Sequence, residues 1–235
     1  MLLTVITSTL LAGLAMPLGA FVASIEHISP DWLEQEFRHT VTAFGGGALL
    51  SAVALVLVPE GINHLPVAYA CAFFIGGGLS FMLLDRWLAR HKTPASQLAA
   101  MLSDFIPESL ALGAAFASGN STALLLAALI GLQNLPEGFS AYREIKSSSS
   151  QSTVTIIAAF AAMALFGPAA GITGYLWLHD AASTIAAIML FAAGGILYSI
   201  FQDIAPQVKL EKHFAPPMGA LLGFSLGLTG FMLTT

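Results

Sequence analysis

The sequence predicts an all-α integral membrane protein with eight transmembrane helices, and three observations support this fold class. Hydrophobic residues make up 57% of the 235-residue chain and charged residues 9%, whereas a soluble domain is about 25% charged. The mean hydropathy is +0.83. Apolar stretches of about 20 residues, enough to cross a hydrocarbon core of about 30 Å, occur eight times. We therefore expect a single transmembrane domain, residues 1–235, that contacts the lipid bilayer and has no soluble appendage.

The eight predicted spans are helices, because a helix satisfies its own backbone hydrogen bonds inside lipid and the stretches are too long for barrel strands. Spans one to eight run from Leu2 to Ile25, Thr40 to Pro59, Val67 to Leu84, Ala95 to Ala117, Thr122 to Tyr142, Thr153 to Trp177, Ala182 to Ala205 and Pro216 to Thr235. Span one resembles a signal peptide, but no basic residue precedes it and Gly13 and Pro17 interrupt its apolar run. We therefore expect it to be the first transmembrane span.

The basic residues give an independent test of this topology. All eight fall after spans one, three, five or seven: Arg38, Arg86, Arg90, Lys92, Arg143, Lys146, Lys209 and Lys212. The positive-inside rule places the connections that carry them in the cytoplasm. We therefore expect both termini to lie outside, and we expect the protein to reside in a plasma membrane such as the bacterial inner membrane.

The composition also excludes some classes of function. The formal net charge of −5 provides no basic surface for nucleic acid, so we expect no nucleic-acid partner. The sequence has no nucleotide-binding loop of the Walker type, which excludes an ATP-driven motor within this chain. Its single cysteine, Cys71, cannot form an intrachain disulfide.

Three carboxylates lie inside the predicted spans and away from the span ends: Asp104 and Glu108 in span four, and Glu137 in span five. Placing an acidic side chain at the centre of a spanning helix costs about 2.5–3.5 kcal/mol. No Lys, Arg or His lies within the predicted span cores to neutralise them. One interpretation is that they are protonated groups whose hydrogen bonds hold helices together. The interpretation that we favour is that a cation bound by the protein neutralises them.

The spacing of the polar residues supports cation binding. Asp104 and Glu108 are four residues apart, as are Gln133 and Glu137, so each pair lies on one face of its helix. A proline precedes each glutamate and removes one helical hydrogen bond, which leaves a backbone carbonyl in need of a partner. The sequence therefore predicts an oxygen-lined chamber between spans four and five, suited to a divalent cation.

The polar-x-x-Pro-Glu motif, repeated on adjacent spans, resembles the ZIP (Zrt/Irt-like) family of divalent-metal transporters. Span five is similar to the family motif at Gln133, Asn134, Pro136, Glu137 and Gly138. The stretches AGLAMPLGA, FGGGALLSAVALVLVPEG and GGGLSFMLLDR of spans one to three are similar to the small-residue helices of the family. The resemblance implies a ZIP-like bundle with a transport site on spans four and five. A divalent metal would then be the transported substrate, and we expect no prosthetic group.

Span four departs from the family pattern. Asp104 stands where the family usually has histidine, Phe105 where it has asparagine, and Ser109 where it has glycine. In span six, Gly167 precedes Pro168 where many members have an acidic residue. Because Phe105 and Gly167 remove two contributors to a second metal site, we expect one bound metal.

The expected ligands are Asp104, Glu108, Gln133 and Glu137, with Asn134 as a weaker candidate. The loss of histidine favours hard ions such as Mn(II), because imidazole suits zinc whereas carboxylates and carbonyls suit harder ions. Zn(II), Mn(II) and Fe(II) all stay open. Two other functions also stay open: an intramembrane metal-dependent hydrolase, and a transport-deficient metal sensor or scaffold.

Other polar and small residues give weaker signals. Asp203 lies three residues before a proline and is interpreted either as part of a cytoplasmic exit path with Glu26 and His27 or as a helix-end residue. On the external side, the cation-gathering candidates are Glu60, His64, His179 and Asp180. Glycines recur at every fourth position from Gly219 to Gly227 and predict a close-packing face, either inside the molecule or at the seam of a homodimer.

Overall fold

The computed structural model describes residues 1–26, 31–88, 90, 94–119, 121–178, 181–208 and 214–234; for 31–35, 94–97, 100, 178 and 207 the description covers the backbone alone. Within these ranges every regular element is helical, which confirms the all-α prediction. Ser118 and Gly119 form a turn after α5, with Gly119 at a φ of 69°.

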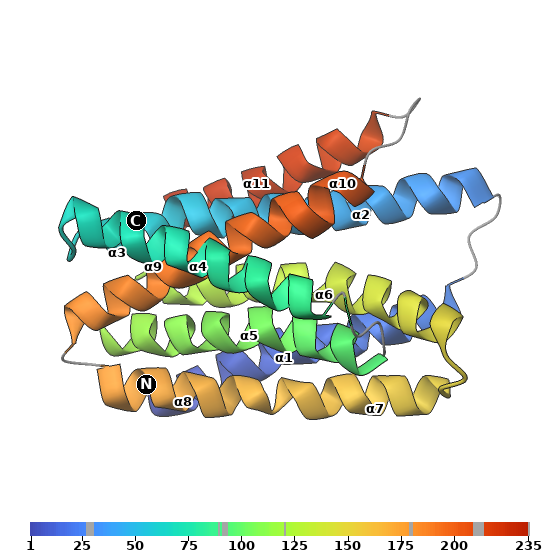
Figure 1. Ribbon diagram of the computed structural model, residues 1–235, viewed down its shortest axis with the longest axis horizontal. Helices are drawn as coiled ribbons and strands as arrows, with labels where there is room; N and C mark the ends of the chain where they lie inside the picture. The colour runs from blue at the N-terminus through green and yellow to red at the C-terminus, as the bar shows by residue number, and fades with distance from the viewer. Residues whose placement is uncertain are drawn as a thin grey trace.

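The helices are α1 (Leu2–Ile25), α2 (Asp31–Ala52), α3 (Val58–Ile62), α4 (Val67–Leu88), α5 (Pro94–Ala117), α6 (Ala123–Ser148), α7 (Thr153–Ala164), α8 (Phe166–Leu178), α9 (Ala182–Ser199), α10 (Ala205–Gln207) and α11 (Ala215–Thr234). Two π-helical turns, η1 (Val53–Leu57) and η3 (Ile200–Ile204), continue α2 into α3 and α9 into α10. Only Leu165 separates α7 from α8. The chain therefore passes back and forth along the bundle (Figure 1).

Among the residues that the structure describes, seven helices are long and apolar enough to cross a membrane: Leu2–Ile25, Glu36–Ile62, Val67–Leu88, Ala123–Ser148, Thr153–Trp177, Ala182–Ile204 and Ala215–Thr234. The protein thus has the architecture of an integral membrane protein. The predicted fourth span corresponds to α5, which is 24 residues long and is not one of these seven.

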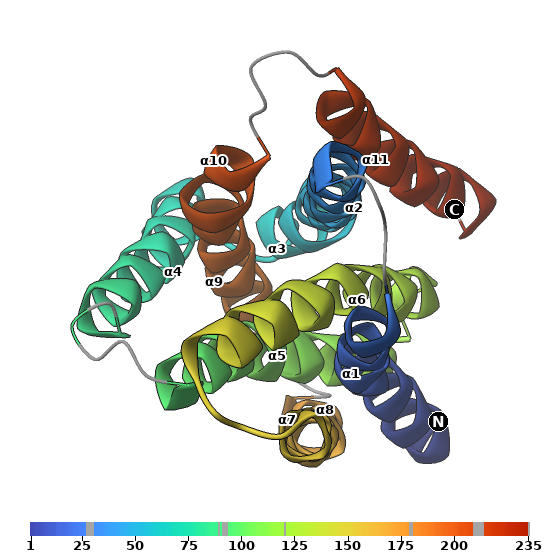
Figure 2. The same ribbon diagram turned by 90° about the vertical axis from the view of Figure 1, so that its right-hand side faces the viewer.

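The helices pack in two groups. In one group α1 lies along α6, α5 lies along α8, and α7 contacts α1. In the other group α2 lies along α11, and α4 and α3 pack against α9. Figure 2 shows the groups end-on, with α5 and α6 on the side of their group that faces the other. Contacts of α6 with α2 and of α5 with α9 join the groups, so the two helices of the predicted site lie at the centre of the bundle.

The two halves of the chain share a pattern that the sequence interpretation missed. The helix contacts repeat when α1, α6, α2 and α11 are matched with α8, α5, α9 and α4, in that order. In the first set α1 packs along α6 and α2 along α11; in the second set α8 packs along α5 and α9 along α4. Pro59 follows the first residue of η1 by six positions, and Pro206 follows the first residue of η3 by the same interval. Because proline has no N–H, it removes a helical hydrogen bond from the preceding turn, and this favours the wider π geometry.

Small residues allow the closest helix crossings. A Cβ at Gly138 in α6 would collide with the backbone of Met16 in α1. In α11, Gly219 lies against Thr40 and Gly223 against Phe44, both in α2. The glycine face of α11 is therefore an internal helix contact, which decides between the two interpretations of that face.

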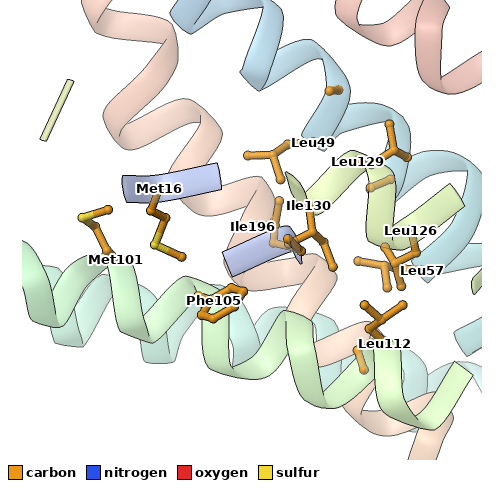
Figure 3. Close-up of a cluster of buried hydrophobic side chains, with 14 of the residues drawn as sticks. Met16, Leu49, Leu57, Met101, Phe105, Leu112, Leu126, Leu129, Ile130 and Ile196 are labelled. Atoms are coloured by element: carbon orange, nitrogen blue, oxygen red, sulfur yellow. The ribbon is translucent and has the colours of Figure 1, made fainter. Parts of the chain in front are cut away.

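A buried apolar cluster connects the two groups (Figure 3). It includes Met16, Leu49, Leu57, Met101, Phe105, Leu112, Leu126, Leu129, Ile130 and Ile196. These side chains come from α1, α2, η1, α5, α6 and α9, so the central helices α5 and α6 have apolar packing on the sides that meet their neighbours. Large apolar side chains are also exposed on the outside of the bundle, among them Val67 and Leu233, as expected for a surface that faces lipid.

Candidate functional site

The site forms where α5 and α6 pass through the middle of the bundle. Each helix continues through an internal proline, Pro107 in α5 and Pro136 in α6, and a glutamate follows each proline directly. Glu108 is only 3% exposed, and Glu137 is half-buried.

A hydrogen bond joins the two motifs across the helix pair. Gln133 Nε2 donates to Glu108 Oε2 at 3.2 Å, and Gln133 is only 6% exposed. The polar faces of α5 and α6 therefore point toward each other at this level, as the four-residue spacing predicts.

Asn134 extends this network to a third helix. Its side chain is fully buried, and its Nδ2 donates to the backbone carbonyl oxygen of Ala12 in α1 at 2.9 Å. Its Oδ1 accepts a hydrogen bond from Gln133 Nε2 at 2.6 Å. The buried polar groups thus form one chain from α1 through α6 to α5.

Asp104 is half-buried and has its hydrogen-bond partner in α9, where Ser199 Oγ donates to Asp104 Oδ1 at 3.5 Å. The carboxylates of Asp104, Glu108 and Glu137 repel one another electrostatically. Among the residues that the structure describes, no basic side chain pairs with any of the three. The site therefore gathers three carboxyl groups that have no basic partner among the described residues.

Two more carboxylates lie close to this charge. Asp203, in η3, acts electrostatically on Asp104 and Glu137. Asp85, in α4, acts on Asp104 and Asp203 and accepts a hydrogen bond from Tyr198. The sequence interpretation noted Asp203 because of the proline after it. It ended the third span at Leu84, one residue before Asp85, whereas α4 continues to Leu88.

The carboxylates do not, however, form a closed metal-binding cluster. In the described part of the chain, no group of three or more His, Cys, Asp or Glu side chains lies close enough to hold a metal ion. The structure joins Glu108, Gln133 and Asn134 by hydrogen bonds, whereas Asp104 and Glu137 act on this group electrostatically.

Phe105 fills the space on the other side of α5. Its ring is fully buried, and the ring atom Cζ would lie 2.7 Å from a Cβ placed at Gly13 and 2.6 Å from one placed at Gly167. An apolar ring therefore occupies the region beside Gly167, where the family resemblance implies contributors to a second metal. Ser109, one turn later, is buried and its Oγ has no hydrogen-bond partner.

The residues predicted for the entrance and exit of a cation lie in different parts of the structure. Glu26 accepts a hydrogen bond from Arg143 at 2.6 Å, and Arg143 also lies over the ring of Phe139 at 5.3 Å. This ion pair ties the end of α1 to α6. Glu60 belongs to α3, and His64 lies in the exposed connection that follows it. His27, His179 and Asp180 lie outside the described residues.

Comparison with known proteins does not assign the chain to a family. No protein-family model matches it, and no curated protein is significantly similar to it. The function is therefore inferred from the chemistry of the site and from the motif in α5 and α6.

Proposed function

We propose that this protein is a divalent-metal transporter of the ZIP type, which moves metal cations across a plasma membrane through a site between α5 and α6. The observation that carries the proposal is the buried pair of Glu108 and Gln133, which lies beside two further carboxylates and has no described basic partner. An uncompensated carboxylate at membrane depth is costly, and a bound cation removes this cost.

The proposed ligands are Asp104, Glu108, Gln133 and Glu137, which offer three carboxylates and one amide oxygen. A divalent cation would draw Asp104 and Glu137 toward Glu108 by side-chain rotation, since Asp104 lies one helical turn from Glu108 and Glu137 one turn from Gln133. Oxygen ligands without imidazole favour Mn(II) over Zn(II). Phe105 limits the site to one ion, because its ring leaves no room beside Gly167.

The proposed topology has eight spans. Seven of them are the apolar helices, and the eighth is α5, which crosses the membrane among them. At about 1.5 Å per residue its 24 residues extend about 36 Å, which is enough to cross the bilayer core. The two ends of the chain lie at one end of the bundle, together with the C-terminal ends of α3, α5 and α8 (Figure 1). Arg86 and Lys146 lie in the last turns of α4 and α6, at the opposite end. The positive-inside rule makes that end cytoplasmic and the termini external.

The repeated packing of the two halves favours transport over the alternatives. Internal repeats with polar sites near the membrane centre are typical of secondary transporters. An intramembrane hydrolase would need a general base and an open coordination position, and no histidine is among the residues that the structure places at this site. A homodimer would have to use a surface other than the glycine face of α11, which packs against α2.

Metal uptake by the purified protein in liposomes tests the proposal. Mn(II), Fe(II), Zn(II), Co(II), Ni(II) and Cd(II) would be offered singly and in competition. Wild-type protein should take up Mn(II) in preference to Zn(II). Glu108→Gln and Glu137→Gln should each lower uptake by about 10- to 100-fold, the equivalent of one charge-assisted contact.

The matched control is Glu144→Gln, which makes the same chemical change on the exposed part of α6 and should leave uptake unchanged. Metal binding without uptake by wild-type protein would support the sensor or scaffold, and hydrolytic turnover without uptake would support the hydrolase. Normal uptake by both site variants would show that the cation does not pass between α5 and α6.

A further inference from the structure

The hydrogen bonds of the two buried side-chain amides, Gln133 and Asn134, can run in only one donor-to-acceptor direction. The carbonyl oxygen of Ala12 can only accept a hydrogen bond, so the amide nitrogen of Asn134 must face it, at 2.9 Å. The amide oxygen of Asn134 must then face Gln133, and it accepts from Gln133 Nε2 at 2.6 Å. The same nitrogen of Gln133 donates to Glu108 Oε2 at 3.2 Å.

This chain determines which atom Gln133 can offer to a cation. Both hydrogens of its amide group are engaged, one by Asn134 and one by Glu108. Its remaining polar atom is Oε1, a neutral oxygen that suits hard divalent cations. If the amide oxygen and nitrogen of Gln133 exchanged places, the N–H hydrogens would point at the cation instead of the oxygen.

We infer that Asn134 is a positioning residue, which fixes the Gln133 amide so that its oxygen is presented to a divalent cation, and that Asn134 is not itself a metal ligand. The inference rests on the proposed function and removes Asn134 from the candidate ligand set.

The surroundings of Asn134 support this role. Successive residues of an α-helix lie about 100° apart around its axis, so Gln133 faces α5 while Asn134 faces α1. Both polar atoms of Asn134 are committed to hydrogen bonds, and its side chain is fully buried.

The Ala12 carbonyl, to which Asn134 donates, is held in place by the close packing of α1 against α6. Gly138, one turn after Asn134, packs against the backbone of Met16, and Gly19 packs against the backbone of Leu135. These close contacts fix α1 against α6 on the same side of the helix as Asn134. The carbonyl of Ala12 therefore keeps its place relative to α6, and the orientation of the Gln133 amide depends on it.

Asn134→Asp separates the two roles of this residue. Aspartate keeps the shape and the oxygen of asparagine but, when ionised, cannot donate to the Ala12 carbonyl. A ligand role predicts equal or tighter metal binding, because a charged oxygen replaces a neutral one. A positioning role predicts weaker binding by about 10- to 100-fold, as for other residues that orient a metal ligand.

The measurement is the dissociation constant of Mn(II) for the full-length protein in nanodiscs, followed by electron paramagnetic resonance. The matched control is Gln151→Glu, which makes the same amide-to-carboxylate change in the exposed connection between α6 and α7 and should leave Mn(II) affinity unchanged. In a Gln133→Glu background there is no amide to orient, so Asn134→Asp should then cause little further loss.

A second variant keeps the test decisive if Asn134→Asp fails to fold. Asn134→Ala removes every polar atom, and X-ray absorption on the Mn(II)-loaded protein counts the donors. We expect weaker binding with an unchanged number of ligands. Loss of one ligand in Asn134→Ala, or undiminished affinity in Asn134→Asp, would overturn the positioning role while wild-type binding still supports transport. Absence of Mn(II), Fe(II) and Zn(II) binding by wild-type protein would overturn the proposed function itself, and the inference with it.

Discussion

Asp104 differs from the other carboxylates of the site in that its hydrogen-bond partner, Ser199, belongs to the opposite helix group. The bond is long, at 3.5 Å, and the carboxylate is half-buried. A cation could therefore displace Ser199 at little cost. Asp104 supplies a charged oxygen where imidazole would favour zinc, so the metal preference should depend on this residue.

Asp104→His should raise the ratio of Zn(II) to Mn(II) uptake several-fold. The change removes one negative charge and adds a nitrogen that suits zinc. A single ligand change shifts relative affinity by on the order of 1–3 kcal/mol. The measurement is competitive uptake of the two metals in liposomes.

The companion variant is Asp104→Ala, which removes the ligand without offering a new one and should lower the uptake of every metal. An unchanged ratio in the histidine variant, together with normal uptake in the alanine variant, would exclude Asp104 as a ligand. The site would then consist of Glu108, Gln133 and Glu137.

At the scale of the helices, the crossing of α1 over α6 depends on small residues. Gly138 lies against the backbone of Met16, where any side chain would collide, and backbone atoms cannot move aside as a flexible side chain does. Tight crossings of this kind supply much of the stability of membrane bundles, since lipid provides little hydrophobic driving force between helices. The same crossing positions the Ala12 carbonyl that Asn134 requires.

Gly138→Val should lower the free energy of unfolding by about 1–3 kcal/mol, as expected for overpacking, and should weaken Mn(II) binding. The matched control is Gly76→Val in α4, because nothing lies within 4 Å of a Cβ at that position. Thermal unfolding in detergent and Mn(II) titration of both variants are the measurements. Equal destabilisation by the two changes would mean that the α1–α6 crossing is not the cause.

For the molecule as a whole, the basic residues and the position of the chain ends agree with the proposed orientation, in which the termini are external. The ends lie together at one end of the bundle (Figure 1), and Arg86 and Lys146 lie in the last helical turns at the other. A metal entering from outside would approach from the end that carries Glu60 and His64. It would leave past Asp203, which lies near the site carboxylates.

Cysteine labelling tests this orientation in a Cys71→Ala background. Single cysteines at Asn63 and Ser121, both exposed, should react with an impermeant thiol reagent applied to intact cells. A cysteine at Ser150, exposed in the connection between α6 and α7, should react only after the cells are opened. Labelling of Ser150 alone in intact cells would reverse the proposed topology.

The sequence by itself determined the helical fold class and the polar face of each of the two central helices. Lipid cannot satisfy backbone polar groups, so each long apolar stretch must be a helix, and seven of the predicted spans have counterparts among the apolar helices. The four-residue spacing placed the polar residues of α5 on one face and those of α6 on one face, and the structure shows that Glu108 and Gln133 of these faces meet. Hydropathy could not locate the π turns or the break at Leu165, because these depend on local hydrogen bonds rather than on apolar character.

The tertiary structure alone decided which distant groups meet at the site. The Ala12 carbonyl reaches Asn134 across 122 positions of sequence, and Ser199 reaches Asp104 across 95. It also placed Asp203 and Asp85 near the site and turned the glycines of α11 inward to α2. Spacing along a helix determines which residues share a face, but the neighbour of that face depends on how all the helices pack together, and the side chains that decide this packing come from every part of the chain.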